Sequence, residues 1–289
     1  HSREQVAPRL ADATIAQALQ PHRGRTLGND QRAALTAIAS SRRMLDLLVG
    51  PAGAGKTTAL RALRRAWEAE HGHGSVIGLA PSAVAAEVLA GDLGISTENI
   101  AKWWQTYLDH GTGFTARQLV IVDEASLAGT LALVRLVRVA ADAGAKVLLV
   151  GDPAQLQSVE AGGAFGMLVA DRTDVAELTD VRRIAAAWEK EATLDLRHGR
   201  IEAIDSYEAR GRIRAGEAER MADAAYGAWQ RDRAAGLVSI LIAESSAMVT
   251  TLNQRARADL ILAGQVDARA EVRLHDRTEA SVGDAIITR

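Results

Sequence analysis

The segment from Gly50 to Thr57 has the residue types and spacing of a phosphate-binding loop. It reads GPAGAGKT, with glycine at both required positions, between an apolar run and an amphipathic helical stretch. Glycines allow consecutive backbone N–H groups to turn toward phosphate oxygens at the positive end of the following helix. The predicted nucleotide contacts are Gly50, Gly53, Gly55, Lys56, Thr57 and Thr58. Lys56 would reach the β- and γ-phosphates and Thr57 would bind Mg²⁺, which predicts ATP and Mg²⁺ as cofactors. A glycine-rich turn without a ligand is the alternative.

A pair of acids supplies the second part of this chemistry. Asp123 and Glu124 directly follow the apolar run from Leu119 to Val122. Asp123 would hold Mg²⁺ through water, and Glu124 would orient and deprotonate the attacking water. Taken alone, such a pair marks an ordinary surface turn, but its place downstream of a phosphate-binding loop favours nucleotide hydrolysis.

A third polar cluster ends another apolar run. It extends from Gly151 to Gln155 and places the Gln155 amide where a neighbouring strand end would meet the γ-phosphate. By itself this segment would be interpreted as an ordinary Asp-Pro turn.

Short apolar runs and longer helical stretches alternate around these residues. The runs predict strands, and the stretches between them have helical periodicity. The predicted strands are 45–49, 75–80, 119–122 and 146–150, and the predicted helices are 57–70, 83–90, 100–108 and 131–143. This alternation indicates an α/β fold with a parallel sheet, as in a P-loop NTPase domain with a RecA-like sheet. Farther on we predict helices at 185–197, 201–208, 218–233 and 248–263 and a strand at 239–243.

Composition excludes several classes of protein. The chain has 289 residues, 48% hydrophobic and 24% charged, with a formal charge of −2, which argues against disorder and against a surface coated in positive charge. It contains no cysteine, so disulfides, iron–sulfur clusters and thiolate zinc sites are excluded. No apolar run approaches the ~18 residues of a membrane span, and no signal peptide opens the chain. We therefore expect a cytoplasmic protein, and the two ends suggest a fragment of something longer.

In their order, these motifs resemble those of superfamily 1 DNA helicases, and within them the RecD-like group that moves 5′ to 3′. Gln31 resembles the Q-motif residue that reads adenine, and Gln155 resembles the nucleotide sensor of motif III. The segment from Leu178 to Arg183 resembles motif IV, whose arginine reaches the γ-phosphate from the second domain. Alignment on the leading leucine of this motif favours Arg183 over Arg182 as the γ-phosphate arginine. Arg182 stays open as the alternative.

Single-stranded DNA is the partner that this resemblance implies. The segments 80–83 and 99–104 resemble motifs Ia and Ib, which lie along single-stranded DNA in the family. The candidate DNA-binding residues are Ser82, Lys102, Trp103 and Trp104. The alternative is that both tryptophans only pack their helix against the core, since large aromatic side chains often do so.

More narrowly, residues 182–211 resemble the helicase part of conjugative relaxases, the TraI/MobF-type, TrwC-like proteins of plasmid transfer. This resemblance implies three parts: a lead-in at 1–27, a RecA-like domain at 28–177, and part of a second RecA-like domain at 178–289 that stops before motifs V and VI. A relaxase nuclease domain upstream is possible in the full-length protein. The chain shows no three-histidine cluster, and we interpret His71-Gly72-His73 as a solvated turn at a helix end. We expect that the chain does not unwind DNA alone.

Three other functions fit parts of the pattern. A RecD-like repair helicase shares the same motifs. A non-catalytic module that binds single-stranded DNA would usually lose the loop lysine or the acidic pair, whereas Lys56 and Asp123 are both present. A small-molecule kinase or GTPase has no place for Gln31 and motifs III and IV in this order.

Overall fold

The computed structural model describes residues 7–155, 163–275 and 278–286. The chain divides into two compact units, His1–Ala209 and Arg210–Arg289, and each is described here by itself. Among the described residues, none of the helices has the length and apolar character needed to cross a membrane.

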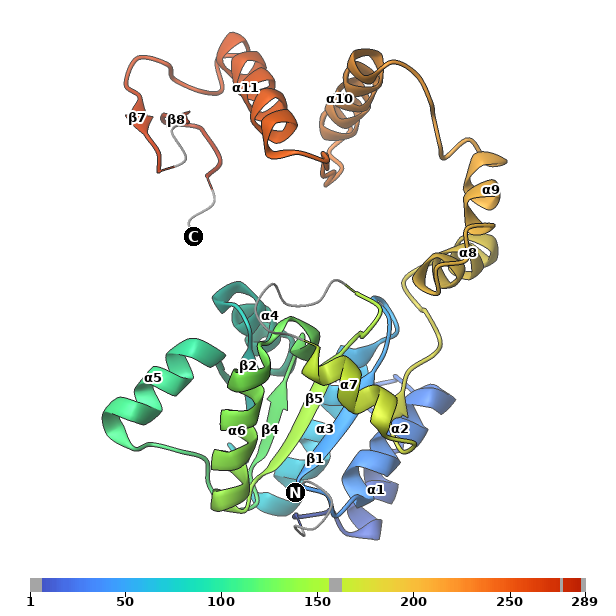
Figure 1. The fold of residues 1–289 in the computed structure, drawn as a ribbon, viewed down its shortest axis with the longest axis vertical. Coiled ribbons are helices and arrows are strands. Elements are labelled where there is room, and N and C mark those ends of the chain that lie inside the picture. Colours follow the sequence, from blue (N-terminus) through green and yellow to red (C-terminus); the bar gives the residue numbers. More distant parts are fainter. Residues whose placement is uncertain (1–6, 156–162, 276–277, 287–289) are drawn as a thin grey trace. The chain divides into compact units, whose positions relative to one another are not determined.

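A six-stranded sheet organises the first unit (Figure 1). Its strand order is β3-β2-β4-β5-β1-β6, and each neighbouring pair is parallel. The strands are β1 (Leu45–Val49), β2 (Val76–Ala80), β3 (Ser96–Asn99), β4 (Leu119–Val122), β5 (Lys146–Gly151) and β6 (Ala176–Glu177). The predicted α/β fold with a parallel sheet is confirmed. The prediction missed β3 and β6, which are short and lack a continuous apolar run.

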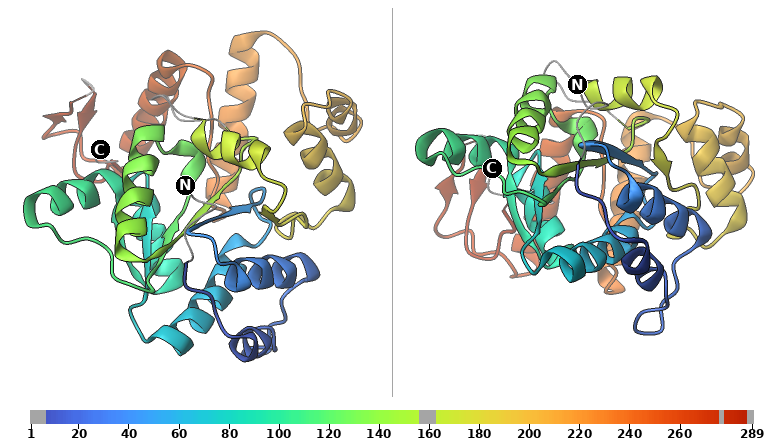
Figure 2. Two further views of the ribbon diagram at one scale, coloured as in Figure 1. Left: turned by 60° about the horizontal axis from the view of Figure 1, so that its bottom comes forward. Right: turned by 90° about the horizontal axis from the view of Figure 1, so that it is seen from below.

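Helices cover both faces of this sheet, which is why β1, β4 and β5 are buried along their whole length (Figure 2). The helices of the unit are α1 (Asp12–Ala18), α2 (Asn29–Ser40), α3 (Lys56–His71), α4 (Ala83–Leu93), α5 (Ile100–His110), α6 (Thr130–Ala143), α7 (Ala164–Asp171), α8 (Ala187–Arg197) and α9 (Ala203–Glu208). Residues of α1 to α4 contribute to one apolar core, and residues of α5 to α7 contribute to the other. Successive side chains of a strand alternate between the cores, so Leu47 belongs to one and Leu48 to the other.

The first unit continues beyond the boundary expected at residues 177 and 178. Leu178 is fully buried, and its N–H donates to the carbonyl of Val49 at 2.8 Å. The division between the compact units falls after Ala209. The three-part domain plan of 1–27, 28–177 and 178–289 stays a prediction.

The second unit contains two long helices and a small antiparallel ribbon. These elements are α10 (Ala218–Ala234), α11 (Ser246–Leu262), β7 (Val272–Arg273) and β8 (Glu279–Ala280). Buried Tyr226 joins the helices by donating its hydroxyl to Asp259 at 2.6 Å. The strand predicted at 239–243 is wrong, because this segment is irregular and Ile240 and Ile242 are exposed. A strand needs a hydrogen-bonded neighbouring strand, and neither strand described in the unit pairs with this segment.

Candidate functional site

The three polar clusters predicted from the sequence meet at the carboxyl edge of the sheet. β1 leads into the loop that begins at Gly50, β4 leads into Asp123 and Glu124, and β5 leads into the turn ending at Gln155. These three strands are neighbours and run in parallel, so their carboxyl ends lie side by side (Figure 1). Ligands of open α/β sheets bind outside such strand ends.

Two glycines give the loop its shape. Gly53 and Gly55 have φ values of 80° and 85°, in the left-handed region that glycine adopts without strain. A Cβ atom on Gly53 would lie 2.6 Å from Cβ of Arg183, and one on Gly55 would lie 2.5 Å from Nε2 of Gln31. Both positions therefore require glycine, for backbone conformation and for space.

Residues outside this loop donate hydrogen bonds to its carbonyl groups. The carbonyl of Gly53 accepts the backbone N–H of Arg182 at 2.8 Å, and that of Ala54 accepts Nη1 of Arg182 at 2.5 Å. The carbonyl of Gly55 accepts Nε2 of Gln31 at 3.0 Å. In a trans peptide, the N–H points away from the C=O, so the N–H groups of Gly55 and Lys56 point to the opposite side of the loop. That side can receive an anion.

Lys56 begins α3 and reaches back over its own loop. Its Nζ donates to the carbonyl of Gly50 at 2.8 Å and to that of Pro51 at 3.4 Å. The ammonium group therefore lies across the loop, where the pattern expects it to meet the β- and γ-phosphates.

Thr57 lies near the carboxylate of Asp92. Its hydroxyl is 3.3 Å from Oδ2 of Asp92 on α4, and Arg61 holds the other oxygen of Asp92 at 3.2 Å. Sequence reasoning missed Asp92, because a single acid on a helix carries no local signal.

Asp123 lies in a negative environment. Burial raises its pKa above the usual value, and the charges of Glu124 and Asp92 raise it further. The backbone N–H of Glu124 and the ammonium of Lys56 oppose this rise in pKa. A divalent cation would relieve the accumulated negative charge, and hydroxyl and carboxylate oxygens are the donors that Mg²⁺ prefers. The residues present therefore fit a Mg²⁺ ion.

Glu124 has an uncommon backbone conformation. Its φ and ψ are 49° and 39°, in the left-handed region, and a short 3₁₀ helix, η1 (Ala125–Leu127), follows it. Few residues other than glycine and asparagine adopt this conformation, and such outliers concentrate at functional sites.

The turn after β5 is fixed by a buried ion pair. Asp152 accepts the N–H of Ala154 at 3.0 Å and receives Nη2 of Arg197 at 2.7 Å. Its side chain is 3% exposed and that of Arg197 is 15% exposed. Gln155 is exposed, with Nε2 at 3.5 Å from Oδ2 of Asp152. Arg197 lies within the segment 182–211 on which the family resemblance rests, and no sequence pattern indicated this contact.

Arg182 and Arg183 both lie beside the phosphate-binding loop. Nη2 of Arg182 pairs with Oδ1 of Asp30 at 2.5 Å, while Arg183 approaches Gly53. Burial alone would raise the pKa of Asp30, but hydrogen bonds from Arg182 and from backbone N–H groups lower it below the usual value. The choice of Arg183 as the γ-phosphate arginine stays a prediction.

Gln31 connects α2 to the loop. Its side chain is buried, Oε1 accepts the N–H of Gly28 at 2.9 Å, and Nε2 donates to Gly55. This places Gln31 at the nucleotide site, and its contact with adenine stays a prediction.

The four candidate DNA contacts lie at the starts of α4 and α5. Ser82 caps α4 by accepting the N–H of Ala85 at 3.1 Å, and Nζ of Lys102 pairs with Glu98 at 2.6 Å. The next two residues of α5, Trp103 and Trp104, are both half-buried. Their DNA-binding role stays a prediction.

The segment His71-Gly72-His73 lies at the end of α3, as expected, but only part of it is a solvated turn: His73 is exposed, whereas His71 is half-buried with its ring centroid 5.1 Å from that of Trp67. The helix ends at His71, and Gly72 follows it with φ of 93°. In the part of the chain that the structure describes, no group of three or more histidine or acidic side chains could hold a metal ion.

A second polar cluster lies at the opposite, amino edge of the sheet. Lys146 is fully buried, and its Nζ donates to the carbonyls of Ser41 and Arg43, both at 2.9 Å, and pairs with Asp46 at 2.7 Å. Burial lowers the pKa of Lys146, and the charge of Asp46 partly offsets this. A lysine in an apolar strand gives no sequence signal for such a network.

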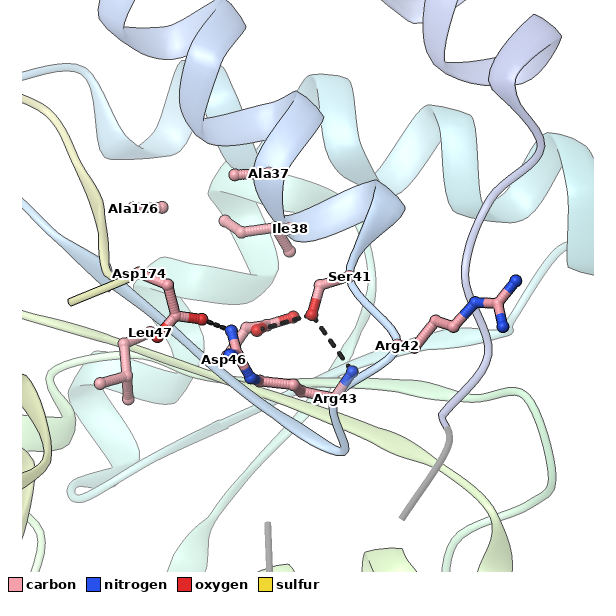
Figure 3. Close-up of a pocket in the computed structure, with 9 residues that line it drawn as sticks. All are labelled: Ala37, Ile38, Ser41, Arg42, Arg43, Asp46, Leu47, Asp174 and Ala176. Atoms are coloured by element: carbon pink, nitrogen blue, oxygen red, sulfur yellow. Dashed lines mark hydrogen bonds and ion pairs between the residues drawn. The ribbon is translucent and has the colours of Figure 1, made fainter. Parts of the chain in front are cut away.

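A pocket of about 290 Å³ opens beside this cluster (Figure 3). Arg43 pairs with Asp174 and Asp46 lies beside Ser41, while the Arg42 side chain points away from them. The lining residues are Ala37, Ile38, Ser41, Arg42, Arg43, Asp46, Leu47, Asp174 and Ala176. Within this cluster Lys146 pairs with Asp46, and Arg43 pairs with Asp174.

Known proteins are similar to this chain in sequence or in fold. A family model described as an AAA domain matches residues 26–218. The chain is 35% identical over 264 residues to the probable conjugal transfer protein TraA of Sinorhizobium fredii (strain NBRC 101917 / NGR234), which covers 90% of this chain and 24% of that protein. It is 36% identical over 268 residues to the conjugal transfer protein TraA of Rhizobium radiobacter, with 90% and 23% covered. Among solved structures, the Pif1 helicase of Candida albicans matches with a TM-score of 0.51 and 16% identity over 80% of this chain and 54% of that chain.

These similarities confirm the resemblance that the motifs indicated. The two relatives are conjugal transfer proteins, and the Pif1 match shows a shared fold. The chain spans less than a quarter of the length of the two relatives.

Proposed function

Because the chain belongs to the AAA domain family, we propose that it is the motor part of an ATP-dependent translocase or helicase that moves 5′ to 3′ along single-stranded DNA. One observation carries the proposal. The phosphate-binding loop, the acidic pair and Gln155 lie at three adjacent strand ends, and the loop carbonyls are held away from the side that faces a phosphate.

Each group of residues in the site has a separate role in ATP hydrolysis. The loop N–H groups and Lys56 bind the phosphates, and Gln155 and Arg183 contact the γ-phosphate. Glu124 orients the attacking water and accepts its proton. Thr57 and, through water, Asp123 would hold a Mg²⁺ ion, which would supply positive charge to neutralise the phosphates. A γ-phosphate contact through Arg183 would couple nucleotide binding to movement of the segment that follows.

We further propose a role in plasmid DNA transfer. The two TraA relatives are conjugal transfer proteins and are much longer than this chain. A relaxase domain would precede this segment in the full-length protein, and the motor would then act on the strand that the relaxase cleaves. Since ATP and plasmid DNA are both cytoplasmic, the proposal places the protein in the cytoplasm.

The test is Mg·ATP binding by the chain, measured by calorimetry. Lys56→Ala is expected to weaken binding at least about 100-fold, because it removes the cation that contacts two phosphates. Lys190→Ala is the matched control, since this lysine lies on α8 and pairs with Asp180. DNA-stimulated phosphate release by the full-length protein should fall to background in Lys56→Ala. Equal ATP binding by the two variants would contradict the proposed nucleotide site.

A further inference from the structure

Arg182 is bound to the phosphate-binding loop through both its backbone and its side chain. Its backbone N–H donates to the carbonyl of Gly53 at 2.8 Å, and its Nη1 donates to the carbonyl of Ala54 at 2.5 Å. These carbonyl groups point away from the side of the loop where the N–H groups of Gly55 and Lys56 can bind an anion. The guanidinium of Arg182 therefore lies on the outer side of the loop, opposite the predicted phosphate positions.

Asp30 of α2 fixes the position of this guanidinium. Its Oδ1 pairs with Nη2 of Arg182 at 2.5 Å, and its Oδ2 accepts the backbone N–H of Asp180 at 3.2 Å. The side chain of Asp30 is only 12% exposed. Burial alone would raise the pKa of Asp30, but hydrogen bonds from Arg182 and from backbone N–H groups lower it below the usual value. Asp30 is thus a carboxylate at neutral pH, and it holds one end of the guanidinium while the other end holds the loop.

Gly28 leaves room for this ion pair. A Cβ atom at this position would overlap Nη2 of Arg182 and lie 3.1 Å from Oδ1 of Asp30. The φ value of Gly28 is −66°, which other residues adopt readily, so space and not backbone conformation calls for glycine here. Alanine at position 28 would therefore displace the guanidinium of Arg182 without removing a charged group.

The next residue, Arg183, contacts the same loop in a different way. A Cβ atom on Gly53 would lie 2.6 Å from Cβ of Arg183 and 3.6 Å from its Cδ, so this side chain lies against Gly53. Within residues 7–155, 163–275 and 278–286, no carboxylate or carbonyl group pairs with the guanidinium of Arg183. Of the two adjacent arginines, Arg182 uses its guanidinium within the fold, and that of Arg183 can meet a phosphate.

We propose that Arg182 is a positioning residue of the nucleotide site: held by Asp30, it keeps the carbonyl of Ala54 turned outward, so that the loop N–H groups face the phosphates. The inference rests on the proposed function, and it assigns the γ-phosphate contact to Arg183 alone. The N–H groups of such a loop contact the α- and β-phosphates, which ADP and ATP share. Loss of the Arg182 side chain therefore weakens binding of both nucleotides, whereas loss of a γ-phosphate contact weakens binding of ATP only.

The first experiment measures binding of Mg·ATP and of Mg·ADP to the chain by calorimetry. Arg182→Ala is expected to weaken binding of both nucleotides about 5- to 30-fold, because the charged hydrogen bond that favours the binding-competent loop is lost. Arg183→Ala should weaken binding of Mg·ATP by a similar factor and leave that of Mg·ADP within about twofold of the wild-type value. Arg200→Ala is the matched control, because this arginine is 56% exposed and pairs with Asp195.

The second experiment displaces the guanidinium of Arg182 without replacing the residue. Gly28→Ala is expected to weaken binding of Mg·ATP and Mg·ADP equally. It should add little to the loss in Arg182→Ala when the two changes are combined, because both remove the same contact with the loop. Gly227→Ala is the matched control, because a Cβ atom there would lie 3.5 Å from Nη1 of Arg231, which is an ordinary contact.

Urea denaturation of the nucleotide-free variants separates positioning from stability. It gives the folded fraction of each variant, so that every affinity refers to folded protein. Arg182→Lys keeps the test valid if Arg182→Ala unfolds. A single ammonium group lacks the planar fork that holds Asp30 and the Ala54 carbonyl together, so this variant should also lose affinity for both nucleotides, by a smaller factor.

The outcomes separate this inference from the function on which it rests. If Arg182→Ala weakens binding of Mg·ATP and not that of Mg·ADP, Arg182 is a γ-phosphate contact and the inference is overturned. Lower stability with unchanged affinity for both nucleotides would also overturn it, because the ion pair would then serve only the fold. Both outcomes leave the nucleotide site itself intact. Absence of Mg·ATP binding by the wild-type chain would overturn the proposed function, and the inference with it.

Discussion

The two edges of the parallel sheet use buried charge in opposite ways. At the amino edge, Lys146 has no exposed surface and its ammonium contacts two carbonyl oxygens and one carboxylate. At the carboxyl edge, Lys56 is half-buried and contacts the carbonyls of its own loop, Gly50 and Pro51. Asp46 has a lysine partner, while Asp123 is half-buried near other acids.

This difference separates structural charges from functional ones. A charged group whose partners all come from the fold contributes to stability and specificity, because removing one partner leaves the other buried and alone. A charged group that has no opposite charge in the fold can pair with a ligand instead. Leaving such a group unpaired lowers the stability of the fold. Three substitutions test this distinction.

The largest effect on stability is expected for Lys146→Met. This change leaves the Asp46 carboxylate buried with the Ser41 hydroxyl at 3.0 Å and, as its nearest remaining cation, the more distant guanidinium of Arg172 at 3.5 Å. The free energy of unfolding should fall by about 3–5 kcal/mol, measured by urea denaturation. Mg·ATP binding by the folded fraction should be unchanged. A loss below about 1 kcal/mol would show that the amino-edge network is not structural.

A smaller effect is expected for Arg197→Ala, which tests the one buried ion pair described at the carboxyl edge. Its partner Asp152 is 3% exposed, so the change should reduce the free energy of unfolding by about 2 kcal/mol. Arg200→Ala is the control, because Arg200 is 56% exposed in its pair with Asp195 and should cost less than about 0.5 kcal/mol. Equal losses for the two variants would remove the distinction between buried and exposed pairs.

The smallest effect, and the only gain in stability, is expected for Asp123→Asn. Burial raises the pKa of Asp123, so the folded chain binds this proton more tightly than the unfolded chain does. The carboxylate is therefore unfavourable for stability at neutral pH, and the penalty is relieved as pH falls through the raised pKa. Asp123→Asn should raise the free energy of unfolding by about 0.5–2 kcal/mol at pH 7. Urea denaturation at pH 7 and pH 4 should show this gain shrinking in acid; a loss of stability at pH 7 would contradict the interpretation.

Local pattern was sufficient to predict most of the sheet. Strands β1, β4 and β5 are continuous apolar runs, because a central parallel strand is buried on both faces. β3 reads STEN and β6 has two residues, so neither carries that signal. The segment 239–243 has the apolar character of a strand, but pairing depends on a neighbour that local pattern does not reveal.

The site was predictable to the extent that its chemistry depends on residue spacing. The loop and the acidic pair have fixed spacings, and the parallel sheet brings them together. The contacts of Asp92, Arg182 and Arg197 depend on side chains from distant segments, so no local pattern indicated them. The different environments of the adjacent Trp103 and Trp104 likewise depend on Phe114 and Arg135, which lie elsewhere in the chain.

The left-handed backbone at Glu124 has a consequence for protein engineering. Glycine or asparagine would adopt φ of 49° more easily, and the glutamate costs about 1–2 kcal/mol at this position. A library of variants selected only for heat resistance would therefore favour glycine or asparagine at position 124. It would enrich chains that survive heating and have lost the carboxylate proposed to activate water.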